Sequence, residues 1–191
     1  MSFSVPRFAS NEERTEKMKQ KHYHRTESIE ENVPRYFDDT GTIYRVGNNL
    51  LADTTYILGG AKYHTDHVGR IIHISFDNLQ LIPSGQTRKS LSSININDIG
   101  KGWECPGDHK GHLIGDRFYG ANSIGNLVPM SPKLNLSSYK VIENIWANAI
   151  CAQKKVRGSI DIIYLDVSFR PMMLNVRFWI DNTESFEILS N

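Results

Sequence analysis

The sequence predicts an α+β domain in which an antiparallel sheet packs against one principal helix. Two observations lead to this fold class. Short segments of strand-like composition, separated by turn residues, occur in residues 42–75 and again in residues 160–189. Between them, one segment carries apolar residues at helical spacing, so a single helix is expected to cover the sheet.

The first group of strands is expected to form an antiparallel meander. Four segments have the composition of strands: 42–46, 54–58, 62–64 and 70–75. Gly47-Asn48-Asn49 and Gly59-Gly60 separate strands as turns. The polar stretch 83–107 is expected to be a long loop with one short strand at 93–97.

The principal helix is expected over residues 131–152. Ser131 is a typical N-cap residue, and Pro132 suits the first helical position. Five apolar side chains then recur on one face: Ile142, Ile145, Trp146, Ala149 and Ile150. We expect Trp146 in the core and a break in the helix near 136–138.

Two strands are predicted after the helix. In 160–164 and 174–180, apolar side chains alternate with polar ones, as in a half-buried strand. Arg170-Pro171 is expected to form the turn between them. Residues 185–189 are expected to add an edge strand.

The N-terminal residues are expected to extend a single domain. Residues 10–32 are dense in charges of both signs and have almost no apolar stripe, which is typical of an exposed helix or a flexible arm. A chain of 191 residues suits one domain with its own core. We therefore expect a charged extension at 1–34 and one folded domain at 35–191.

Composition excludes several classes of protein. The sequence is 39% hydrophobic and 23% charged, which is ordinary for a globular protein. No apolar run reaches the roughly 18–20 residues of a membrane helix, and the first residues lack the apolar region of a secretory signal. We expect no membrane insertion by this chain. Cys105 and Cys151 are expected to be buried thiols, with one disulfide as the alternative.

Charge is distributed unevenly along the chain. The formal net charge of +1 argues against a globally basic surface that binds nucleic acid. Residues 101–157, however, contain eight Lys and Arg against four Asp and Glu. This local excess suits contacts with a phosphate backbone, and the alternative is a solvated surface of mixed charge.

Residue types suited to catalysis are densest between residues 108 and 147. Five short elements follow one another there: Asp108-His109-Lys110-Gly111-His112, Arg117-Phe118-Tyr119-Gly120, Asn126-Leu127-Val128-Pro129-Met130, Leu134-Asn135, and Glu143 ahead of Trp146. In this order they resemble the pattern of the DNA/RNA non-specific endonucleases. The resemblance is to the toxin domains of bacterial secretion systems, and more distantly to streptococcal and Serratia-type nucleases. Asp116 and Tyr119 depart from the small residues that the toxin branch often has there.

The resemblance implies a ββα-metal (His-Me finger) motif within the α+β fold. It also implies an Mg²⁺-dependent, sequence-nonspecific endonuclease that hydrolyses DNA and also RNA, with Mn²⁺ as a substitute cofactor. His112 would be the general base, and Asn135 the direct protein ligand of one Mg²⁺. Such domains are often antibacterial toxins, exported by a specialised secretion system, active in the target-cell cytoplasm and blocked by a cognate immunity protein. An intracellular enzyme is the alternative.

Phosphodiester hydrolysis itself requires these residue types. A water must lose a proton, and an imidazole can accept one near neutral pH. A cation must offset the charge that develops on the phosphate. The neutral carbonyl of an asparagine is a hard ligand that Mg²⁺ accepts while it keeps most of its waters. As isolated residues, His112 would more often be a core or loop histidine and Asn135 a helix cap.

Other residues are expected to assist. Glu143 lies eight residues after Asn135, so both point to one side if the helix is continuous, and Glu143 can then accept hydrogen bonds from the waters of the metal. Arg117 is expected to contact the scissile phosphate. Three residues are expected to support the site, Asp108, Gly111 and Asn126, and two to contact nucleic acid, Lys133 and Lys140. The alternative for each is an ordinary structural or surface role.

Two further functions remain open at this point. His64 with His67 and His109 with His112 form two HxxH pairs that could assemble a zinc-dependent hydrolase site, with Cys105 nearby in sequence. A catalytically inactive module that binds nucleic acid is the second alternative.

Overall fold

The computed structural model of the chain describes residues 33–83, 91 and 93–191. The elements below belong to the unit Arg35–Asn191. The helix or arm expected at residues 10–32 lies outside the described residues, as does part of the loop expected at 83–107.

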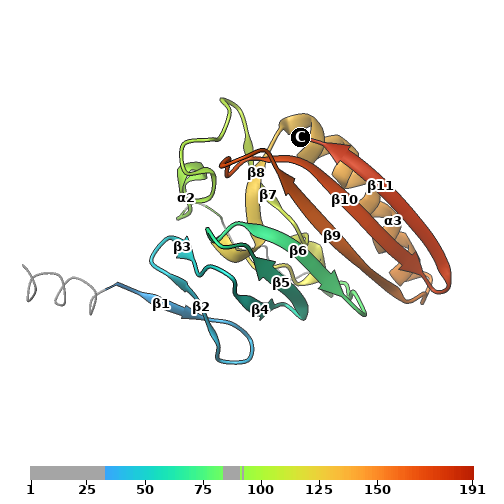
Figure 1. Ribbon diagram of the computed structural model, residues 1–191. Helices are drawn as coiled ribbons and strands as arrows, with labels where there is room; N and C mark the ends of the chain where they lie inside the picture. The colour runs from blue at the N-terminus through green and yellow to red at the C-terminus, as the bar shows by residue number, and fades with distance from the viewer. Residues whose placement is uncertain (1–32, 84–90, 92) are drawn as a thin grey trace, which may run out of the picture. The chain divides into compact units, whose positions relative to one another are not determined.

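A six-stranded antiparallel sheet forms the centre of this unit (Figure 1). Its strands, in spatial order, are β11 (Thr183–Ser190), β10 (Pro171–Ile180), β9 (Val156–Tyr164), β6 (Ile71–Phe76), β5 (Ala61–Thr65) and β4 (Thr55–Leu58). Six predicted strands, at 54–58, 62–64, 70–75, 160–164, 174–180 and 185–189, are therefore confirmed in this sheet, and β11 is the predicted edge strand. The strand expected at 42–46 also forms, but it belongs to a separate small sheet and not to the meander. Gly59 and Gly60 have positive φ in the turn from β4 to β5, which explains their choice.

The helix α3 (Tyr139–Cys151) lies along one face of the strands β9, β10 and β11 (Figure 1). Trp146 of this helix is fully buried, and its ring packs edge-on against the rings of Phe76, Phe118 and Phe178. The helix is thus fixed to the sheet through a large buried aromatic contact, as expected for Trp146.

The start of the helix departs from regular α-geometry. Residues Leu134–Ser138 form a π-helical stretch, η3, directly before α3, at the place where the sequence predicts a break. Ser131 caps this end, because its Oγ accepts a hydrogen bond from the backbone N–H of Leu134 at 3.2 Å. Single π-turns of this kind are frequent at functional sites.

A two-stranded hairpin precedes the helix in the chain. It consists of β7 (His109–His112) and β8 (Leu127–Met130), which pair antiparallel with His112 opposite Leu127. Two short 3₁₀ helices, η1 (Asp116–Phe118) and η2 (Ile124–Asn126), occupy the connection between the strands. The five motif elements therefore fall on one continuous hairpin–helix segment.

A second, small sheet consists of β1 (Arg35–Phe37), β2 (Ile43–Val46) and β3 (Asn49–Leu50). Asp38 ties it to β4, since its carboxylate accepts backbone N–H groups of Thr40, Thr42 and Ile57 at 2.8–2.9 Å. Burial alone would raise the pKa of Asp38, but these hydrogen bonds and that of the Thr40 hydroxyl lower it to about 2.

Two expectations are wrong. The short strand expected at 93–97 is replaced by a helical turn, α2 (Ile96–Gly100), whose start is stabilised by the Asp98 carboxylate accepting from the Asn95 N–H at 2.9 Å. This local hydrogen bond outweighs the strand-like alternation of the segment. Cys105 and Cys151 are free and exposed instead of buried, because they lie in a turn and at the last position of α3. In the described part of the chain, no helix is long and apolar enough to cross a membrane.

Candidate active site

A groove of about 420 Å³ lies between the end of β7 and the start of the helix. Five of the nine predicted site residues line it: His112, Arg117, Asn135, Lys140 and Glu143. The other four predicted residues lie outside its lining. A smaller cavity of about 150 Å³, lined partly by Leu50 and Lys101, contains none of the nine.

His112, the last residue of β7, is held by a side chain from the same connection. Its Nε2 lies 2.6 Å from Oδ1 of Asn122, which can only accept, so Nε2 carries the hydrogen and donates it. Asn122 is oriented in turn, because its Nδ2 donates to Asp116 Oδ1 at 3.4 Å. In the neutral ring, the lone pair is therefore on Nδ1, the nitrogen that is available as a base.

Asn135 lies in η3, and its amide orientation is set by His109. The amide nitrogen Nδ2 donates to Nδ1 of His109 at 3.0 Å. Within the described residues, the carbonyl oxygen Oδ1 has no hydrogen-bond partner. Because Asn135 lines the groove, this oxygen suits a hard divalent cation that keeps most of its waters.

Glu143 is buried on the groove side of α3. Its Oε2 accepts from Lys140 Nζ at 2.7 Å, and the absence of a side chain at Gly115 makes room for Oε1, which a Cβ there would overlap. Tyr139 beside it donates its hydroxyl to the carbonyl of Leu113, the residue after His112. Burial and the charge of Glu143 raise the pKa of Tyr139, so its hydroxyl stays protonated and fixes the helix to the end of β7.

Asn135, Tyr139 and Glu143 all line the groove, so the helix presents them on one side across the π-helical stretch. Charges of both signs line the groove, with Arg117 and Lys140 beside Asp116 and Glu143. Arg117 also donates to Asn144 Oδ1 at 2.8 Å. Lys133 is exposed and does not line the groove.

Asn126 and Gly111 lie under the site. The amide of Asn126 is fully buried; its Oδ1 accepts from the Ile114 N–H and the Tyr63 hydroxyl, and its Nδ2 donates to the carbonyls of Ile114 and Ala121. All four of its hydrogen-bonding positions are thus used inside the connection from β7 to β8. Gly111 packs against Met130, which a Cβ would overlap.

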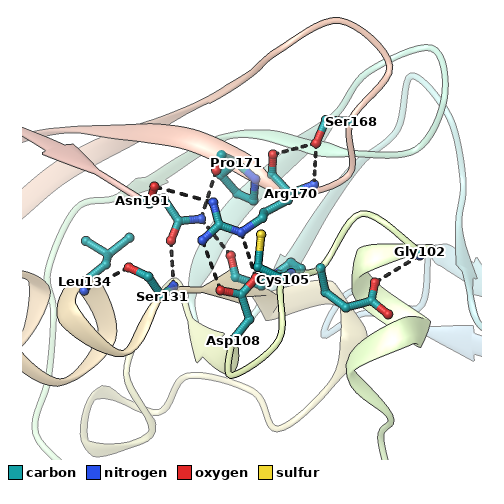
Figure 2. A network of polar contacts seen from close by, with 11 residues as sticks. Gly102, Cys105, Asp108, Ser131, Leu134, Ser168, Arg170, Pro171 and Asn191 are labelled. Carbon is teal, nitrogen blue, oxygen red and sulfur yellow. Dashed lines mark hydrogen bonds and ion pairs between the residues drawn. The ribbon is translucent and has the colours of Figure 1, made fainter.

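Asp108 lies one residue before β7 and forms an ion pair with Arg170 (Figure 2). Arg170 donates Nε to Oδ2 at 2.7 Å and Nη2 to Oδ1 at 3.0 Å. Burial alone would raise the pKa of Asp108, but the hydrogen bonds from Arg170 and from the Cys105 N–H outweigh it and lower the pKa. Asp108 is thus an anchoring carboxylate in this structure.

Sequence reasoning missed Asn122 and Arg170, and it considered His109 only as half of a zinc pair. No local pattern marks Asn122, which lies in an ordinary turn sequence. Arg170 is 62 residues from Asp108 in the chain, so spacing carries no information about this pair.

The structure does not support the zinc alternative. His64 Nδ1 bonds to Thr55 Oγ1, and His109 and His112 bond to different asparagines. Among the described residues, which include both HxxH pairs and Cys105, no three His, Cys, Asp or Glu side chains gather to hold a metal ion. A cation with one amide ligand and a shell of water still fits the groove, since it needs no such cluster.

Comparison with known proteins identifies two similarities. The family model described as DNA/RNA non-specific endonuclease matches residues 52–182. The chain is also 28% identical over 138 residues to the type VII secretion system protein EssD of Staphylococcus aureus, in strains USA300, NCTC 8325 / PS 47 and Newman. The match covers 69% of this chain and 22% of the relative, so the chain spans a small part of the relatives it matches.

Proposed function

Because the chain belongs to the DNA/RNA non-specific endonuclease family, we propose that it is an Mg²⁺-dependent endonuclease that hydrolyses phosphodiester bonds of DNA and RNA, with Mn²⁺ as a substitute. The observation that carries the proposal is the convergence of His112, Asn135 and Glu143 on one groove. The hairpin β7–β8 and the helix η3–α3 are then the ββα-metal motif of the enzyme.

His112 removes the proton from the attacking water through Nδ1, because Nε2 is occupied by Asn122. Asn135 would hold the cation through Oδ1, and Glu143 would accept hydrogen bonds from the waters around it. When bound, the cation offsets the negative charge that develops on the phosphate and on the leaving 3′ oxygen. Arg117, and Lys140 beside Glu143, contact phosphate oxygens.

Sequence nonspecificity follows from the kind of contact available. The groove offers charged and amide side chains, which suit contacts with phosphate oxygens. Backbone contacts then dominate binding, and KM should rise with salt concentration.

A cleavage assay on plasmid DNA and on structured RNA tests the function. The wild-type protein should cleave in Mg²⁺ and not in EDTA. His112→Ala should lower kcat by about 10²–10⁴-fold, whereas His73→Ala, a histidine of β6 paired with Asp161 outside the groove, should not. Equal activity of His112→Ala and wild type would refute the assignment. Binding of DNA without cleavage by the wild type would favour the inactive module.

The similarity to a type VII secretion system protein supports a role as the toxin domain of an exported effector. We propose that residues 35–191 carry the nuclease activity, that it acts in the target-cell cytoplasm, and that a cognate immunity protein blocks the groove. Expression in a bacterial cytoplasm should arrest growth, and His112→Ala should not. If both proteins arrest growth equally, toxicity does not come from this site.

A further inference from the structure

One network of polar contacts connects the active-site hairpin to a distant part of the sheet. Figure 2 shows its centre, where Arg170 from the turn between β9 and β10 faces Asp108. The side chain of Asp108 is only 2% exposed and that of Arg170 17%. A two-point ion pair of this kind fixes both distance and angle between its partners, because the planar guanidinium matches the carboxylate.

Asn191 extends the network to β8. Its Oδ1 accepts from the N–H of Ser131 at 2.7 Å, and its Nδ2 donates to the carbonyls of Pro129 and Pro171 at 2.9 Å (Figure 2). Pro129 and Ser131 are two residues apart in the chain. A residue of a neighbouring strand could bond to a carbonyl and an N–H with this spacing, as the Asn191 amide does. The Asn191 amide thus replaces one residue of a strand at the end of β8.

Arg170 and Asn191 are themselves fixed to each other and to the sheet. Arg170 Nη1 donates to the main-chain oxygen of Asn191 at 3.4 Å, and the Asn191 N–H donates to the Met172 carbonyl at 2.9 Å. Ser168 closes the turn, since its Oγ donates to the Arg170 carbonyl and accepts from the Arg170 N–H.

The residues that this network holds lie close in sequence to the site residues. Asp108 directly precedes β7, which ends at His112. Ser131 directly precedes Pro132, where the helical residues that lead into η3 begin, and its carbonyl accepts from the backbone N–H of Asn135 at 2.9 Å. The network therefore holds Asp108, just before β7, on one side and Pro129 and Ser131, at the end of β8, on the other.

We propose that Arg170 and Asn191 are positioning residues that set the separation between His112 and Asn135 by bracing the two ends of the β7–β8 hairpin. This role rests on the proposed nuclease function. Neither residue lines the groove, so both act through the backbone. Their loss should weaken the cation site and slow cleavage without removing any group from the groove.

Arg70→Gln provides a matched control for Arg170→Gln. Arg70 also forms a buried ion pair, with Asp66 at 2.7 Å and side-chain exposures of 12% and 11%. It also bonds to the turn between β9 and β10, through the carbonyls of Asp166 and Ser168. Its hydrogen bonds go to neither β7 nor β8, so Arg70→Gln loosens the same turn without removing a contact to the hairpin.

The experiment compares Arg170→Gln, Asn191→Ala and Arg70→Gln in the full chain. The first two should raise the apparent Mg²⁺ activation constant by about tenfold, the scale seen when a residue behind a metal ligand is removed. Arg70→Gln should leave the constant unchanged at a comparable loss of Tm. Arg170→Lys, which keeps the charge, should recover part of the effect.

Nuclear magnetic resonance gives a readout that does not depend on cleavage. In Arg170→Gln and Asn191→Ala, the side-chain amide signals of Asn135 and the backbone signals of 109–112 should shift, whereas Arg70→Gln should leave them in place. Unchanged Asn135 signals, or a Mg²⁺ constant that moves equally in all three variants, would overturn the positioning role. If the wild type does not cleave nucleic acid, the proposed function fails, and the amide signals still decide the role of the brace.

Discussion

The amide nitrogen of Asn135 donates to Nδ1 of His109 at 3.0 Å, across the gap between η3 and β7. This contact turns the carbonyl oxygen of Asn135 away from His109. His109 thereby fixes the orientation of the Asn135 amide.

His109→Ala should raise the apparent Mg²⁺ activation constant by about tenfold, because the Asn135 amide loses the acceptor that orients it. The measurement is a Mg²⁺ titration of cleavage, repeated by calorimetry. His67→Ala, an exposed histidine in the turn between β5 and β6, is the control. An unchanged titration would show that Asn135 keeps its orientation without His109.

Asn122→Ala should slow cleavage by about 10–100-fold. Without the Asn122 carbonyl, His112 is free to place its hydrogen on Nδ1, and the base is then lost in part of the molecules. Nitrogen chemical shifts of the imidazole report which nitrogen carries the hydrogen. Asn48→Ala, an exposed asparagine paired with Asp98, should change neither rate nor shifts. A pure Nε2–H form in Asn122→Ala would contradict this account.

Gly115→Ala should reduce activity although it removes no functional group. Its φ of −60° suits alanine, but the new Cβ would overlap Oε1 of Glu143 and displace that side chain. The loss should match that of Glu143→Gln, which keeps the volume and removes the charge. Both are measured as kcat at saturating Mg²⁺. Full activity of Gly115→Ala beside an inactive Glu143→Gln would mean that the carboxylate need not occupy its observed place.

Acid should remove the stabilisation that Asp38 provides. Its pKa is about 2 in the folded protein and close to 4 in an unfolded chain, so the carboxylate contributes stability above about pH 4 and loses it as pH falls towards 2. The difference in unfolding free energy between wild type and Asp38→Asn should therefore shrink over this range. Urea unfolding at several pH values measures it, with Asp77→Asn as an exposed control. A constant difference would contradict the prediction.

Periodicity sufficed for the strands and the main helix, because burial on one face imposes a repeat that the sequence displays. The alternation in 160–164 and 174–180 predicted β9 and β10, and the apolar face around Trp146 predicted α3. At 93–97 the same reasoning failed, because the local hydrogen bond from the Asn95 N–H to the Asp98 carboxylate stabilises a helical turn there.

The candidate site likewise contains residues that the sequence predicted and residues that it did not. The order of the motifs led us to expect His112, Asn135 and Glu143 close together. They line one groove because all three lie on one short hairpin–helix segment. Residues that orient them were not predictable, because their contacts depend on rotamers and on distant pairing. The contact between Asn122 and His112 depends on the side-chain rotamer of Asn122. Asn191 and Ser131 are in contact although they lie 60 residues apart in the chain.

The π-helical stretch Leu134–Ser138 determines the direction in which Asn135 points around the helix axis. It holds a wider turn than a regular helix between Asn135 and the sheet-bound part of α3. Eight residues of a regular α-helix would turn about 800° and leave Asn135 and Glu143 about 80° apart around the axis, whereas the wider π-turn lets both line the same groove. The number of residues in η3 therefore sets the direction in which Asn135 points relative to Glu143.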